Sequence, residues 1–128
     1  MKRTLLIVVT STLLVSAFSF NRTSFYDEAA RKKITQEILD NFVKEDFDAV
    51  RKDFHSSLKT SLPADKIGEV WQSVINNGGK YISVISVNTS KVQEYNQVKM
   101  RIKFEKENAT LETIFNEDDK VLGLWIKP

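Results

Sequence analysis

Residues 97–105 read Gln-Val-Lys-Met-Arg-Ile-Lys-Phe-Glu, and this stretch decides the fold. Polar and apolar side chains alternate strictly along it. Successive side chains of a β-strand point to opposite faces of the sheet, so the alternation predicts a strand with one face on an apolar core and one face in water. Burial on one face only is typical of antiparallel sheets.

Three further strands are predicted around this one. We expect the alternating strand to cover residues 93–105, with the others over residues 80–87, 109–116 and 121–127. The last three are joined by short connections, which predict an antiparallel meander. Its final hairpin turns at residues 117–120, where acidic residues and Lys120 lie between two apolar runs.

The first and last strands carry apolar residues on both faces. In residues 80–87, Tyr81, Ile85 and Val87 are expected on one face, with Ile82 and Val84 on the other. We therefore expect this strand to be well covered. In residues 121–127, Leu122, Leu124 and Ile126 are expected opposite Val121 and Trp125.

Before the strands, apolar residues recur at helical spacing. One helix is expected from Ser24 to Val43, a second over residues 47–58, and a third from Pro63 to the Gly78-Gly79 pair. Proline is tolerated at a first helical position, and glycine accepts the left-handed conformation that ends a helix. Helices followed by strands predict an α+β fold, with three N-terminal helices packed on a curved four-stranded antiparallel sheet.

The N-terminus has the pattern of a secretory signal peptide. Lys2 and Arg3 precede an uncharged, largely apolar run over residues 4–20, and small residues follow near Ala17. We expect residues 1–19 to be the signal peptide and residues 20–128 to form one domain. A retained membrane anchor is the alternative, but the run is shorter than the roughly 20 apolar residues that a spanning helix needs. The expected localisation is therefore secreted or periplasmic.

The charge balance gives no indication of a nucleic-acid partner. The chain has 19 basic and 17 acidic residues, and removal of Lys2 and Arg3 leaves equal numbers of each. Binding to nucleic acid relies on a basic excess. We expect no nucleic-acid partner, and no membrane association after cleavage of the signal peptide. Lys99, Arg101 and Lys103 form a basic row that is expected to be a solvated strand face.

Composition also excludes several classes of site. The chain has no cysteine and one histidine, which excludes disulfides, thiolate zinc sites, iron–sulfur clusters, a cysteine nucleophile and multi-histidine metal sites. No glycine-rich phosphate loop, ordered serine–histidine–aspartate set or metal-binding motif occurs in the sequence. We expect no cofactor and no metal.

Three segments carry a family resemblance. Residues 42–50 read FVKEDFDAV, residues 58–66 precede Trp71 and Gly79, and residues 115–124 read FNEDDKVLGL. The first is similar to a recurring segment of the cone-shaped nuclear-transport-factor-2-like superfamily, also called SnoaL-like or cystatin-like. The others resemble a domain-of-unknown-function family within it, often found ahead of α/β-hydrolase domains. The resemblance implies a pocket at the open end of a cone, between sheet and helices.

Enzymes of that superfamily place an acid or base in this pocket, where burial moves its pKa toward neutrality. The candidates here are His55, Glu94 and Glu112, with Asn96 close by. We expect His55 to lie at a helix end and the two carboxylates to be solvated. No acid–base pair has a useful spacing, so we assign no catalytic residue and do not expect an enzyme.

Bulky residues are instead the candidate ligand-binding set. Those expected near the pocket are Phe54, Trp71, Tyr81, Met100 and Trp125. An aromatic cavity could hold a small apolar ligand or a peptide side chain, although core packing is the commoner use of such residues. The leading hypothesis is an exported, non-enzymatic binding domain with an apolar pocket. The alternatives are a small isomerase, dehydratase or cyclase that uses a pocket carboxylate, and a homodimer formed through the exposed sheet face.

Overall fold

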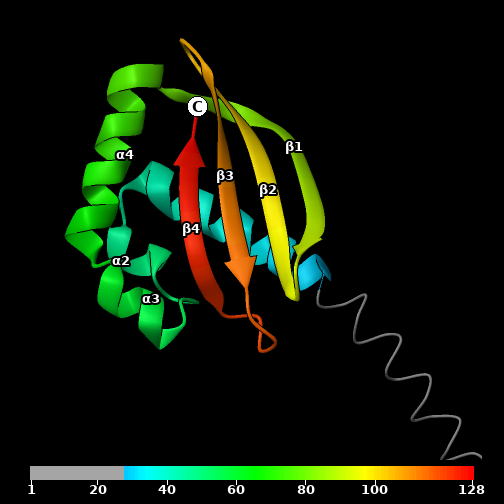
Figure 1. Cartoon of the computed structure of the whole chain (residues 1–128). Coiled ribbons are helices and arrows are strands. Elements are labelled where there is room, and N and C mark those ends of the chain that lie inside the picture. Colours follow the sequence, from blue (N-terminus) through cyan, green and yellow to red (C-terminus); the bar gives the residue numbers. More distant parts are fainter. Residues whose placement is uncertain (1–27) are drawn as a thin grey trace, which may run out of the picture. The chain divides into compact units, whose positions relative to one another are not determined.

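The alternating stretch forms β2 (Tyr95–Phe104) in the computed structural model, which describes residues 28–128. The neighbouring strands are β1 (Tyr81–Val92), β3 (Asn108–Phe115) and β4 (Val121–Lys127). They form one antiparallel sheet in the order β1-β2-β3-β4, in which each strand pairs with the next in sequence. The sheet is curved and is not closed into a barrel (Figure 1). The predicted meander is confirmed. The expected signal peptide lies outside the described residues.

Helices precede the sheet, as predicted for an α+β fold. The first occupies residues 28–44, and it is followed by α2 (Phe47–Val50), α3 (Ser56–Ser61) and α4 (Ala64–Gly78). α4 runs beside β4, while α2 and α3 lie near the lower end of α4 in Figure 1. Pro63 is the residue just before α4, and Gly79 ends the helix with a φ of 81°. The α+β class predicted from the sequence is confirmed.

The apolar face of β2 supplies the centre of the core. Val98, Met100, Ile102 and Phe104 are all buried there, as their alternation predicts. The helices contribute aromatic rings to the same core. Phe42 stacks on Trp71 with ring centroids 5.1 Å apart, and Trp71 contacts Phe104 at 5.8 Å. Burying one such side chain contributes about 1.5–3 kcal/mol, so the inner face of the sheet holds the helices in place.

The second predicted helix is interrupted, which corrects its expected single span over residues 47–58. Between α2 and α3 the backbone pairs with β4 instead: Val121 N–H donates to Asp53 O at 2.9 Å, and His55 N–H donates to Val121 O at 2.9 Å. The two bonds form a parallel bridge between Phe54 and Val121. A backbone group that pairs with a strand cannot also close a helical turn, so the helix breaks where Phe54 enters the core.

β1 is less covered than its sequence predicts. Its pairing with β2 shifts register twice, between Tyr81 and Ser83 and between Val84 and Ser86. Each shift adds a residue to β1, and an added residue resets the alternation of faces. Consequently Ile82 and Ile85 are each 51% exposed. Tyr81, Val84 and Val87 pack on the core instead, so the expected grouping of Tyr81 with Ile85 and Val87 is wrong.

One buried polar contact fixes the first helix against the sheet. Thr35 and Thr113 are both fully buried, and their hydroxyl oxygens lie 2.9 Å apart. Thr35 also donates to the carbonyl of Arg31 at 2.9 Å, so in this contact its oxygen accepts from the Thr113 hydroxyl. Four residues from Thr35, Arg31 pairs with Asp119 of the β3–β4 turn at 3.0 Å. Helix and hairpin are therefore joined by polar contacts at two points.

This arrangement predicts unequal effects of two similar substitutions. Thr35→Val leaves the Thr113 hydroxyl buried without a partner, which should cost about 1–3 kcal/mol of unfolding free energy. Thr113→Val should cost less, because Thr35 keeps its bond to the Arg31 carbonyl. The double variant should lose less than the sum of the single losses. Urea denaturation measures all three, and equal losses for the two single variants would contradict this hydrogen-bond direction.

Candidate functional site

The structure separates the five predicted ligand-binding residues. Phe54, Trp71 and Met100 are 3%, 4% and 0% exposed and belong to the core. Tyr81 is half-buried and contacts Phe104 edge-on, 6.2 Å between ring centroids. Trp125 is 46% exposed. Phe104 thus links Trp71 to Tyr81, whereas Trp125 lies apart, and ligand binding by this set stays a prediction.

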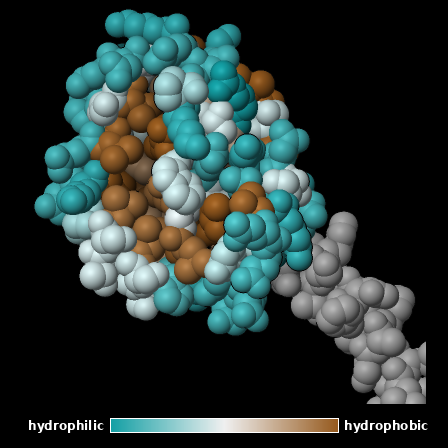
Figure 2. Space-filling model, viewed as in Figure 1, coloured by the Kyte–Doolittle hydropathy of each residue, from teal (hydrophilic) through white to brown (hydrophobic). Residues whose placement is uncertain are grey.

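A groove lies instead between α4 and β4. Its volume is about 200 Å³. It is lined by Phe42, Leu62, Ile67, Val70, Leu124, Trp125 and Ile126. Figure 2 shows apolar residues gathered in a hollow on the same side of the molecule, bordered by hydrophilic ones. Every lining residue is apolar or aromatic, so the groove offers an apolar surface to a ligand.

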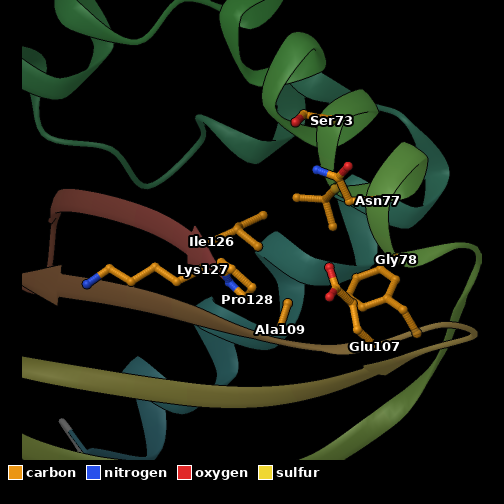
Figure 3. A pocket seen from close by; sticks show the side chains of 10 residues that line it. Ser73, Asn77, Gly78, Glu107, Ala109, Ile126, Lys127 and Pro128 are labelled. Atoms are coloured by element: carbon orange, nitrogen blue, oxygen red, sulfur yellow. The ribbon is translucent and has the colours of Figure 1, made fainter.

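A smaller cavity of about 140 Å³ extends the groove toward the C-terminal end of α4. Both cavities include Ile126, which points toward α4 in Figure 3. Ser73 and Asn77 of α4 and Glu107 line this second cavity, making it more polar. The side chain of Lys127 extends away from α4 (Figure 3). The gap beside β4 is therefore apolar in one part and hydrogen-bonding in the other.

Local sequence explains both walls. In α4 the apolar stripe is broad: Ile67 and Trp71 reach the core, while Val70 remains 40% exposed at the groove. In β4 the pairing with β3 shifts register between Ile114 and Phe115. Because of this shift, Val121 packs on the core together with Leu124 and Ile126. The expected grouping of Val121 with Trp125 is therefore wrong.

β4 is also an edge of the sheet. One side pairs with β3, and the other side is bridged at Val121 by the segment around Phe54. Within residues 28–128, no strand pairs with that outer side over residues 123–127. An edge strand with free backbone groups can accept a further strand.

The candidate acid–base residues lie elsewhere. His55 caps α3, where its Nδ1 accepts from Ser57 N–H at 3.1 Å. Glu94 is exposed in the β1–β2 turn. Glu112 lies on the outer face of the sheet, opposite Trp125, and pairs with Lys127 at 3.5 Å. None of these three lines either cavity beside β4.

No helix within residues 28–128 is long and apolar enough to cross a membrane. Nor does this part bring together three histidine or acidic residues in a geometry that could hold a metal ion.

Most of the groove is not predicted from the sequence. Leu62, Val70, Leu124 and Ile126 line it, and no pattern in the sequence marks these four residues as a binding surface. The available signal was the width of the apolar stripe in α4, which exceeds what one buried face needs. The outer part of the stripe becomes a groove wall only because α4 lies beside β4, and that position follows from tertiary packing.

Gly123 leaves room for Trp125 on the outer face of β4. A Cβ atom at position 123 would lie 2.7 Å from Cζ3 of Trp125 and closer still to Cη2. Gly123→Ala should therefore displace the indole ring, at a cost of about 1 kcal/mol in unfolding free energy. Acrylamide quenching of tryptophan fluorescence should increase. Gly68→Ala is the control, because its Cβ would meet Phe47. Unchanged quenching in Gly123→Ala would contradict this ring position.

Comparison with known proteins gives one result. A family model described as "Protein of unknown function (DUF3887)" matches residues 35–124. No curated protein and no solved structure matches the chain. The matched residues begin at the buried Thr35 and end at Leu124 in the groove wall. Since the match covers well over half of the 128 residues, the chain belongs to the DUF3887 family of proteins of unknown function.

Proposed function

We propose that this chain is an exported, non-enzymatic binding module. Its groove between α4 and β4 would hold an extended apolar segment of a partner protein. The observation that carries this proposal is the position of the apolar groove along the free edge of β4. A peptide strand added there would gain backbone hydrogen bonds from β4, and its alternate side chains would enter the groove.

The chain already uses this edge in the same way. Residues 53–55 pair with Val121 through two backbone hydrogen bonds, and the side chain between them, Phe54, is buried. This contact covers only one end of β4. A bound segment would continue the same pairing along residues 123–127.

The size of the groove favours peptide side chains over an enclosed small molecule. The two cavities measure about 200 and 140 Å³. Pockets for drug-sized ligands usually measure roughly 300–1,000 Å³. A strand needs space only for the side chains on one of its faces, because its backbone remains at the sheet edge.

We further propose that the chain belongs to the nuclear-transport-factor-2-like superfamily. Helices that precede an antiparallel meander, with a hollow beside the sheet, support membership of the nuclear-transport-factor-2-like superfamily. The basic start and apolar run of residues 2–20 support export. A homodimer through the outer face of the sheet is less favoured. A symmetric contact centred on β2 would bring the row of Lys99, Arg101 and Lys103 close to its own copy, and like charges repel.

A charged substitution in the groove tests the proposal. Val70→Glu places a carboxylate in the apolar wall and should weaken binding at least tenfold, or about 1.4 kcal/mol. Val43→Glu is the matched control, because Val43 has nearly the same exposure, 42% against 40%, and does not line the groove. The probe is a fluorescent ten-residue peptide with leucine at alternate positions, titrated against the protein without its first nineteen residues.

Hydrogen exchange identifies the mode of binding. Pairing should slow the exchange of backbone amides within residues 123–127 of β4, whereas a ligand confined to the groove would leave them unchanged. If dodecanoate binds and the peptide does not, the occupant of the groove is a small apolar ligand and not a partner protein. Equal effects of the two substitutions, or no binding of either probe, would exclude the groove as the site.

A further inference from the structure

The outer face of the sheet, which points away from the helices, concentrates positive charge. On β2 this face carries Lys99, Arg101 and Lys103. The residues that alternate with them are buried on the inner face, so these three point outward. Lys127 of β4 joins them, because it pairs with Thr110, which pairs with Arg101. Among the described residues of β2, β3 and β4 that face this way, Glu112 is the acidic one.

Glu112 compensates only part of this charge. It lies opposite Lys99 in the pairing of β2 with β3, forms an ion pair with Lys127 at 3.5 Å and lies 3.5 Å from the Gln97 amide nitrogen. Arg101 donates to the hydroxyl of Thr110 at 2.8 Å. Within residues 28–128, no carboxylate forms an ion pair with the three basic residues of the row.

This charge is a property of one face and not of the whole protein. The described part contains equal numbers of basic and acidic residues. The outer face of β2, β3 and β4 carries four basic residues against Glu112, and this excess creates a local positive potential, which attracts an anionic partner. Side chains two residues apart on a strand are about 7 Å apart, so the row extends over roughly 14 Å.

Neutral hydrogen-bonding side chains flank the row, except where Glu112 of β3 lies opposite Lys99. On β1, Ser83, Ser86 and Asn88 pair in register with Lys103, Arg101 and Lys99. On β3, Asn108 and Thr110 pair with Lys103 and Arg101. Hydroxyl and amide groups donate and accept hydrogen bonds, so they suit a partner that is rich in hydroxyls as well as anionic.

An exposed aromatic ring completes this surface. Trp125 lies over Gly123, two strands from the row, and is 46% exposed. A flat indole face offers an apolar platform, and the apolar face of a sugar ring can stack on it. Cations, hydroxyls and an indole together match the chemistry of a charged sugar chain.

We propose that the outer face of the sheet binds a linear acidic glycan, a sugar chain that carries carboxylate or sulfate groups. The anionic groups lie along Lys99, Arg101 and Lys103. Sugar hydroxyls contact the neutral side chains of β1 and β3, and one sugar ring stacks on Trp125. The three basic residues lie outside the groove, whereas Trp125 also lines it.

The test uses polygalacturonate and dextran sulfate as glycan probes, with uncharged dextran as the reference. The protein without its first nineteen residues is titrated at low and at physiological salt. Substitution of Lys99, Arg101 and Lys103 by glutamine should weaken binding about tenfold and flatten its dependence on salt. The matched control replaces Lys44, Lys59 and Lys66 by glutamine, which removes the same charge from exposed helical positions. The control should retain affinity within about twofold.

Two further probes separate the glycan from other anions. Polyglutamate carries carboxylates without hydroxyls or sugar rings, and it should bind about tenfold more weakly than polygalacturonate. Vesicles of anionic phosphatidylglycerol test a membrane surface. The proposal is overturned by equal losses in the two triple variants, by polyglutamate binding as tightly as polygalacturonate, or by binding to vesicles in place of the glycans. Absence of binding to either glycan at low salt overturns it as well.

Discussion

Burial of one face of the sheet is the constraint on which the rest of the structure depends. The side chains that alternate inward from β2 and β3 require a cover, and the first helix and α4 provide it through Phe42 and Trp71. The Thr35–Thr113 contact then restricts where the first helix can lie, because a shift would leave a buried hydroxyl without a partner. The helices therefore cover the centre of the sheet. Beside β4 they leave part of the inner face uncovered, and the groove opens there.

The parts of the fold that could be predicted depend on local pattern. The alternation at residues 98–104 predicts the orientation of β2, and Gly79 predicts the end of α4. Two details could not be predicted because their causes are not local. The break between α2 and α3 depends on pairing with Val121, more than sixty residues away. The exposure of Ile82 and Ile85 depends on two register shifts, which the apolar pattern of β1 does not indicate.

The site was harder to predict than the fold, for a physical reason. Large apolar residues serve both as core and as binding surface, and composition does not distinguish these uses. Trp71 and Met100 fill space inside, while the less conspicuous Val70 and Leu124 border the groove. The separation of Trp125 from Leu124 and Ile126 was visible in the alternation of β4. Val121 joins the latter two only because of a register shift next to the hairpin.

β4 connects the two proposed surfaces through the geometry of a single strand. Leu124 and Ile126 face the helices and the groove, whereas Trp125 lies over Gly123 on the side of Glu112 and borders the groove from there. Because alternate residues of a strand serve different faces, a substitution on α4 or β2 alters one surface and leaves the strand between them intact. A strand that pairs with the backbone edge of β4 leaves the side chains of β4 on the faces where they already lie. The basic row and the α4 wall of the groove therefore lie on different faces of the sheet, and Trp125 borders both surfaces.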